Sequence, residues 1–121
     1  MIYTSYFAQL KKIGKANGYA VSIAKWNPKW YTGDTCAWLQ PDASLLIHYK
    51  EGAINEDEYR KQFLDDLSRM DPEPIIDELK DAAGDRDIYL LCYEKPSDFC
   101  HRHIVAEWLK QNNIKCEEKV W

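Results

Sequence analysis

The sequence has no long apolar run and no excess of positive charge. None of its 121 residues belongs to an apolar stretch near the roughly 18 residues that suggest a membrane-spanning helix. The opening residues also lack the basic segment and apolar run of a secretory signal, so we expect a cytoplasmic protein with no membrane partner. Sixteen Lys and Arg against twenty Asp and Glu give a net charge of -4. This balance disfavours generic nucleic-acid binding through a global positive field.

Closely spaced cysteine pairs are missing as well. The nearest two of the four cysteines (Cys36, Cys92, Cys100 and Cys116) have seven residues between them, so the Cys-x-x-Cys knuckles of a zinc ribbon are absent. A structural zinc site is therefore only a minor alternative, and no cofactor is indicated. The chain is 45% hydrophobic and 13% aromatic, which is enough to fill one core without disulfides. We expect free thiols and a single domain over residues 1–121.

Apolar runs separated by turn signals predict alternating strands and helices. Strands are expected over residues 2–4, 19–24, 88–93 and 114–120. Helices are expected over residues 5–13, 41–50, 55–70, 71–83 and 99–111, with start signals at Ser5, Asn55 and Asp71. The run 88–93 is the most apolar and should be the central strand, whereas the last strand alternates as an edge strand does. Strands separated by helices predict an α/β fold, a three-layer α/β/α domain with a small, mostly parallel sheet of about four strands.

The segment 25–35 is irregular and carries three large aromatic residues. Pro28 and Gly33 interrupt regular structure around Trp26, Trp30 and Tyr31. One interpretation is a loop anchored to its own domain by rings that pack at the rim of the core. The other is a stacking wall for a planar ligand such as a nucleobase, with Lys25 and Lys29 beside it.

Reactive residue types gather where the apolar strand 88–93 passes to the last helix. Ser97 and Asp98 are good N-cap residues, so this helix is expected to start near Phe99. Three functional residues then fall in its first turn, where unpaired N–H groups and the helix dipole favour a thiolate or a bound anion: Cys100, His101 and Arg102. Cys92 enters the same region from the end of the strand.

Three functional hypotheses suit this joint. The helix end, Arg102 and His101 could bind an anion, with Glu94 holding another group of the ligand. Alternatively, Cys100 or Cys92 attacks an electrophile while a histidine moves the proton. A metal held by Cys92, Cys100 and one histidine is the third hypothesis. A Cys-x5-Arg phosphatase loop is not supported, because neither cysteine is followed by an arginine at that spacing.

Each of these residues also has a purely structural interpretation. Cysteine is among the most buried residue types, and for Cys36 and Cys116 we expect simple core positions. Cys92 suits a core position as well as it suits a site. An arginine near a helix start is often paired with an acid, which here would be Glu107 or an acid that caps the helix. His101 and His103 lie two apart on a helix and diverge, so only one of them should join a common metal.

The joint resembles the signature of the domain-of-unknown-function 488 family (DUF488): Leu90-Leu-Cys-Tyr-Glu94, a short loop with Pro96, then Cys100-His-Arg102 and an apolar helix. The opening Ile2-Tyr-Thr4 and the length are similar too, so the resemblance covers essentially the whole chain. Many members of that family carry Asp-Val-Arg at the end of the second strand, where this chain has Val21-Ser22-Ile23 and then Lys25-Trp26. This sequence is thus similar to a smaller branch with a Ser-Ile strand and a Trp-Tyr segment, here Trp30-Tyr31.

The resemblance implies a compact α/β protein with its functional edge at the joint, but it implies no reaction. Parallel strands would bring residues 5–6, 25–26 and 92–102 to one edge of the sheet. Our hypothesis is a crevice for a small anionic or nucleotide-like ligand, with chemistry by Cys100, His101, Cys92 and Glu94 as in a hydrolase or transferase. The ligand-binding candidates are Arg102, Ser5, Tyr6, Lys25, Trp26 and Trp30. The alternative is a non-catalytic interaction module with a partner surface formed by Trp26, Trp30 and Trp121. No feature of the sequence indicates an oligomeric state.

Overall fold

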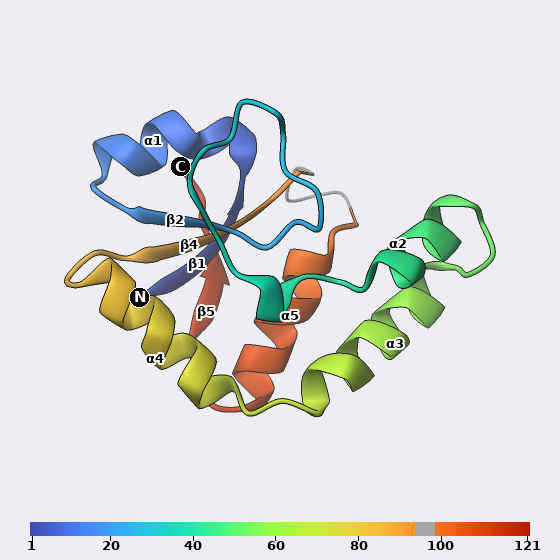
Figure 1. The fold of residues 1–121 in the computed structure, drawn as a ribbon. Coiled ribbons are helices and arrows are strands. Elements are labelled where there is room, and N and C mark those ends of the chain that lie inside the picture. Colours follow the sequence, from blue (N-terminus) through green and yellow to red (C-terminus); the bar gives the residue numbers. More distant parts are fainter. Residues whose placement is uncertain (94–98) are drawn as a thin grey trace.

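The computed structural model describes residues 1–93 and 99–121, and its described part is built around a parallel sheet (Figure 1). The five strands of that sheet lie in the order β3-β2-β4-β1-β5. All neighbouring strands pair in parallel. The strands are β1 (Ile2–Tyr6), β2 (Tyr19–Ser22), β3 (Asp34–Thr35), β4 (Ile88–Cys92) and β5 (Cys116–Glu118). The predicted α/β fold is confirmed, with a sheet slightly larger than expected.

Helices cover both faces of the sheet. The described helices are α1 (Leu10–Lys15), α2 (Ala43–Lys50), α3 (Glu56–Ser68), α4 (Pro72–Ala83) and α5 (His101–Gln111), with 3-10 turns at Phe7–Gln9 and Ala37–Leu39. Figure 1 shows α1 on one face and α4 and α5 on the other, while α2 and α3 reach beyond the sheet. None of these helices combines the length and apolar character that crossing a bilayer requires.

The central position of β4 follows from its composition. Every side chain of β4 is buried, and the strand pairs with β2 on one side and β1 on the other. Its alternate side chains enter different cores: Leu90 packs with α3, α4 and α5, whereas Leu91 packs with Phe7 and Ile13 on the α1 face. A strand covered on both faces must be apolar throughout, which is why this run was recognisable in the sequence.

The start signals in the middle of the chain form the expected caps. The Glu58 backbone N–H donates to the Asn55 side chain at 2.9 Å, and the Asn55 N–H donates to the Glu58 carboxylate at 3.2 Å. At the start of α4, Asp71 accepts from the Glu73 N–H at 3.1 Å. The helix ends at Gly84, whose φ of 63° favours glycine.

The first strand and the first helix differ from the prediction. Ser5 does not cap a helix, because β1 continues through Ser5 and Tyr6, which pair with Leu91 and Cys92 of β4. A 3-10 turn follows, and α1 begins only at Leu10. Backbone pairing to a neighbouring strand, which no local signal announces, extends β1. The short edge strand β3 was likewise missed, inside a segment expected to be irregular.

Candidate functional site

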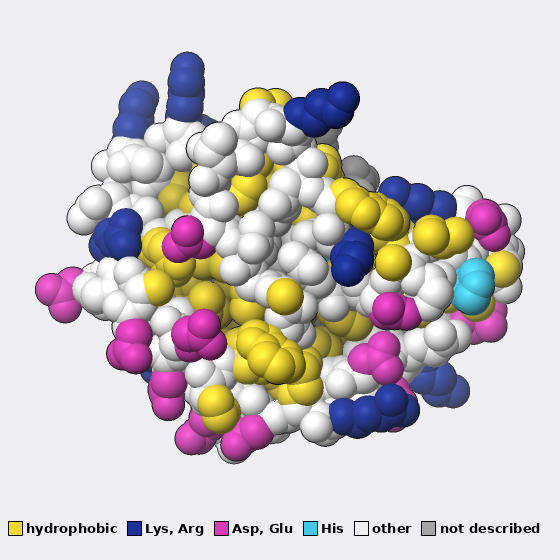
Figure 2. Space-filling view, in the orientation of Figure 1, with side chains coloured by type: hydrophobic (Ala, Val, Ile, Leu, Met, Phe, Trp, Pro, Cys, Tyr) yellow, Lys and Arg dark blue, Asp and Glu magenta, His cyan; other side chains and the backbone are white. Residues whose placement is uncertain are grey.

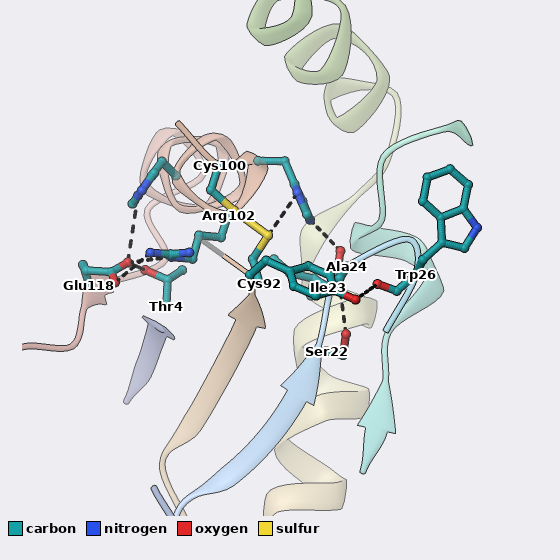
Figure 3. Close-up of a disulfide and its surroundings, with 12 residues drawn as sticks. Thr4, Ser22, Ile23, Ala24, Trp26, Cys92, Cys100, Arg102 and Glu118 are labelled. Carbon is teal, nitrogen blue, oxygen red and sulfur yellow. Dashed lines mark hydrogen bonds and ion pairs between the residues drawn. A yellow bond between two sulfur atoms is a disulfide. The ribbon is translucent and has the colours of Figure 1, made fainter. Parts of the chain in front are cut away.

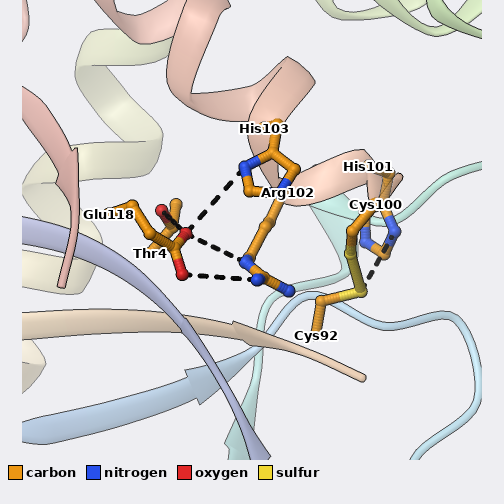
Figure 4. Close-up of polar contacts among 7 residues, drawn as sticks. All are labelled: Thr4, Cys92, Cys100, His101, Arg102, His103 and Glu118. Carbon is orange, nitrogen blue, oxygen red and sulfur yellow. Dashed lines mark hydrogen bonds and ion pairs between the residues drawn. A yellow bond between two sulfur atoms is a disulfide. The ribbon is translucent and has the colours of Figure 1, made fainter. Parts of the chain in front are cut away.

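Cys92 and Cys100 meet where β4 ends and α5 begins (Figure 3), and His101 lies beside them (Figure 4). Cys92 is the last residue of β4, and Cys100 precedes α5 with an extended backbone (φ -151°, ψ 142°). The prediction of free thiols is wrong for this pair, since the two sulfurs form a disulfide. The fold brings the strand end and the helix start together, which the spacing in the sequence does not reveal. The other two cysteines are free and buried, as predicted.

The ring of His101 is held between a sulfur and a backbone carbonyl. Its Nδ1 lies 3.4 Å from Cys92 Sγ, and its Nε2 lies 2.6 Å from the carbonyl oxygen of Ile23. A carbonyl only accepts hydrogen bonds, so Nε2 carries the proton, and Nδ1 of the neutral ring faces the sulfur with its lone pair.

The surroundings of His101 keep the ring uncharged. Burial lowers the pKa of His101 to about 4, and the positive charge of Arg102 and the neighbouring His103 act in the same direction. The hydrogen bond to the Ile23 carbonyl opposes this shift. At neutral pH the imidazole is therefore uncharged, and the lone pair of Nδ1 can accept a hydrogen bond or bind a metal ion.

A cavity of about 340 Å³ opens beside Cys92 and His101. Two lysines line it, Lys25 from the loop after β2 and Lys50 from the end of α2, together with Trp26. The ammonium group of Lys50 lies 5.4 Å from the centre of the Trp26 ring. Tyr93 holds the loop in place, because its hydroxyl donates to the Trp26 carbonyl at 2.6 Å. Two positive groups and one aromatic face therefore border a sulfur and an imidazole.

Arg102 does not line this cavity and lies between Glu118 and the disulfide (Figure 4). Its side chain is fully buried, and its guanidinium donates to the Glu118 carboxylate at 3.0 and 3.3 Å. The Thr4 hydroxyl donates to the same carboxylate at 2.7 Å, and the Tyr6 ring lies 5.6 Å from the guanidinium. Arg102 is thus paired with an acid, although with Glu118 rather than Glu107; a role in ligand binding stays a prediction.

Other candidates lie away from the cavity. Ser5 is buried in β1, and its hydroxyl has no hydrogen-bond partner within the described residues. Tyr6 accepts a hydrogen bond from Gln9, and Trp30 is exposed and makes an edge-to-face ring contact with Phe7. Glu94 falls outside the described residues, so its predicted role stays a prediction.

The start of the last helix also needs correction. We expected it near Phe99, with Cys100 inside its first turn, but α5 begins at His101 and Cys100 is its N-cap. The proposed caps, Ser97 and Asp98, fall outside the described residues. Of the sequence-predicted residues, the structure therefore brings together Cys92, Cys100 and His101, with Lys25 and Trp26 at the adjoining cavity.

Three participants in these contacts had no sequence signal. Lys50 looked like an ordinary residue at a helix end, and the Ile23 carbonyl is a backbone group. Glu118 lies on an edge strand, where an acid is unremarkable. The acidic and basic residues around the joint suggest that ion pairs form there. Their charges alone do not indicate which residues pair.

Tryptophans reach the surface at several points. Trp26, Trp30 and Trp121 are about half exposed or more, and so is Trp38, which the sequence did not single out. Figure 2 shows hydrophobic side chains in more than one patch on the face that it presents. Trp121 stacks on Tyr89 with ring centres 6.0 Å apart. A Trp-rich partner surface stays a hypothesis.

Comparison with known proteins identifies a family. The family model DUF488-N3a, described as "Active DUF488-N3 subclade", matches residues 12–113. That span contains β2, β3 and β4, the described residues that line the cavity, and the cysteine pair. No curated protein and no solved structure matches this chain.

Proposed function

This chain belongs to the DUF488 family, and we propose that it is a cysteine-dependent enzyme for a small anionic substrate. In this proposal Cys92 is the nucleophile, His101 is its base, and Lys25 and Lys50 bind the negative group of the substrate. The description of the matching subclade as "active" agrees with an enzyme.

The observation that carries the proposal is the contact between Cys92 and His101. The Nδ1 atom lies 3.4 Å from the sulfur, and the hydrogen bond from Nε2 to Ile23 aims the unprotonated nitrogen at it. A base within reach of a thiol, itself oriented by a third group, is the arrangement that nucleophilic catalysis requires. Cys92 borders the cavity and Cys100 does not, which supports Cys92 as the attacking thiol.

The walls of the cavity support an anionic substrate. Lys25 and Lys50 provide positive charge, and no acidic residue lines this cavity within the described part of the chain. Trp26 offers a flat face beside Lys50, on which a planar group such as a nucleobase would stack. The substrate would therefore bear a phosphate or carboxylate, with or without a ring.

The chemical step needs the dithiol form of the protein. An external thiol reductant supplies two electrons and two protons to the disulfide and is itself oxidised. Cys92 then passes its proton to His101 Nδ1, because the thiolate that forms beside the ring stabilises the imidazolium, as the disulfide does not. The thiolate attacks the electrophilic centre while a leaving group departs. Transfer of the bound group from sulfur to water makes a hydrolase, and transfer to another acceptor makes a transferase.

Alkylation kinetics test the proposal without a known substrate. In Cys100→Ser no disulfide forms, and the rates at Cys92 are measured by peptide mass spectrometry with a metal chelator present. Iodoacetate carries a carboxylate and iodoacetamide does not, so the ratio of their rates reports the anion site. We expect Cys92 to prefer iodoacetate several-fold more than a free thiol peptide does, because the two lysines attract the carboxylate.

Variants separate the roles. In the Cys100→Ser background, His101→Gln should slow both reagents at Cys92 by about 100-fold, because the base is lost. Lys25→Gln and Lys50→Gln should each lower the iodoacetate preference by about threefold, whereas Lys29→Gln, in the same loop but outside the cavity, should leave it unchanged. A Cys92 thiol that labels only on unfolding, or that shows no preference for the anion, would overturn the proposal.

A further inference from the structure

The three side chains at the joint also form a set of metal ligands. One atom each from Cys92, Cys100 and His101 lies within 4.8 Å of the others, and all three residues are buried. We propose that the reduced protein binds one Zn²⁺ ion through Cys92 Sγ, Cys100 Sγ and His101 Nδ1. This inference goes beyond the proposed function, because a zinc-bound Cys92 is a ligand and no longer a free nucleophile.

The orientation of His101 is the one a zinc ligand needs. A histidine bound to a metal through one nitrogen usually donates its other N–H to a carboxylate or a backbone carbonyl. Here Nε2 lies 2.6 Å from the Ile23 carbonyl oxygen, which leaves Nδ1 unprotonated and directed at Cys92. The ring would not have to turn or lose a proton to coordinate the ion.

The spacing of the cysteines fits a shared ion. Their Cα atoms lie 7.2 Å apart. Most disulfide-bonded cysteines have Cα atoms roughly 4.4–6.8 Å apart, so this pair is wider than usual. Two thiolates of a tetrahedral zinc site, with Zn–S bonds of about 2.3 Å, have their sulfurs about 3.8 Å apart. Separation of the sulfurs after reduction, with little movement of the backbone, would make room for the ion.

Charge and ligand type favour zinc. Two thiolates and one neutral imidazole leave a Zn²⁺ site with no net charge, which suits a buried position. Thiolate sulfur selects Zn²⁺ over Mg²⁺ and Ca²⁺, which take oxygen ligands. Three protein ligands leave a fourth position, and the cavity beside Cys92 and His101 can supply it with water or an anion.

The same cysteines make zinc binding depend on oxidation. In the forward direction a thiol reductant opens the disulfide, and Zn²⁺ binding releases the two thiol protons. In the reverse direction a peroxide takes two electrons from the two thiolates, a sulfur–sulfur bond forms, and Zn²⁺ leaves. With two protons taken up from the buffer, hydrogen peroxide becomes two water molecules, so atoms and charges balance.

Cobalt and zinc titrations of the full chain test this inference. The protein is reduced with a phosphine, and Co²⁺ is added because it takes the place of Zn²⁺ and absorbs visible light. We expect one Co²⁺ per chain, with thiolate-to-cobalt charge-transfer absorption and the visible bands of a tetrahedral site. Zn²⁺ should then displace the cobalt and abolish both signals.

Matched variants and the oxidised protein complete the test. Cys92→Ser, Cys100→Ser and His101→Gln should each weaken zinc binding by more than about 100-fold, since loss of a supporting second-sphere group alone costs about 10–100-fold. Cys36→Ala removes a thiol elsewhere and should bind as the wild type does. The wild-type disulfide form, which needs no mutation to fold, should bind no zinc until it is reduced. Peroxide should release zinc from the loaded protein, and denaturing mass spectrometry should then find the chain two hydrogens lighter per disulfide than the dithiol form.

Cobalt spectra without thiolate bands, or equal zinc binding by the oxidised and reduced protein, would overturn the inference. The alkylation experiment runs in chelator, so its outcome is separate: a reactive Cys92 with no zinc binding leaves the proposed function standing alone. Tight zinc binding by a protein whose metal-free Cys92 is unreactive would leave only the metal site.

Discussion

The buried imidazole of His101 should make the stability of the disulfide form depend on pH. Burial lowers the pKa of this ring to about 4 in the folded protein, against 6.5 in an exposed histidine. As the pH falls below 6.5, the unfolded chain binds a proton that the folded protein does not bind until about pH 4. The free energy of unfolding therefore rises with pH across this window, and this contribution levels off above it.

The size of the effect follows from the difference between the two pKa values. One pKa unit corresponds to about 1.4 kcal/mol, so the contribution of His101 between the two pH limits is on the order of 3 kcal/mol. The free energy of unfolding of an average domain is roughly 5–15 kcal/mol, so the contribution of His101 is a large fraction of it. The effect should therefore be visible above the smaller contributions of surface carboxylates.

Urea unfolding from about pH 4 to pH 7 measures this pH dependence of the free energy of unfolding. The disulfide is kept intact and a chelator is present, so that neither thiols nor metals take part. His101→Gln keeps an amide that can donate to Ile23 but does not titrate, and it should remove most of the slope. His48→Gln, on the exposed face of α2, should keep the wild-type slope. Equal pH dependence in the wild type and His101→Gln would refute the reasoning.

Two further predictions concern packing. Glu118→Gln removes the carboxylate that pairs with a fully buried guanidinium and should cost about 2–4 kcal/mol of unfolding free energy. The control Glu117→Gln, on the exposed side of β5, should cost no more than about 0.5 kcal/mol. Equal losses of stability in urea unfolding would contradict the buried pair. Gly18→Ala would push a methyl group into the ring of Tyr89 and should lower the thermal midpoint, while Gly14→Ala, with open space around it inside α1, should raise it slightly. The reverse order of the two midpoints would show that the packing at the end of α1 is not as described.

Much of the fold was predictable because its signals are local. The caps at Asn55 and Asp71 lie within a few residues of the backbone groups they bind, and the all-buried β4 must be apolar along its whole length. The missed strand β3 and the longer β1 depend instead on hydrogen bonds to distant strands. Pairing of that kind leaves little trace in a two-residue or five-residue stretch.

The candidate site, too, was predictable from the sequence only in part. Its location was predictable, since Cys92, Cys100 and His101 are reactive residue types placed where a strand passes to a helix. The roles within it were not predictable, because they depend on contacts such as that between His101 and the Ile23 carbonyl, separated by 78 residues. Neither the disulfide nor the neutral ring could be deduced from the spacing.

The sequence by itself determined the α/β class, the central strand, the capped helices and the position of the reactive joint, because periodicity and capping act over a few residues. Only the tertiary structure decided which side chains meet there. Strand order places the loop after β2 beside the end of β4, and so puts Lys25 and Trp26 next to the Cys92–His101 pair. Packing of α5 against the sheet buries Arg102 on Glu118, since a guanidinium removed from water requires a carboxylate partner.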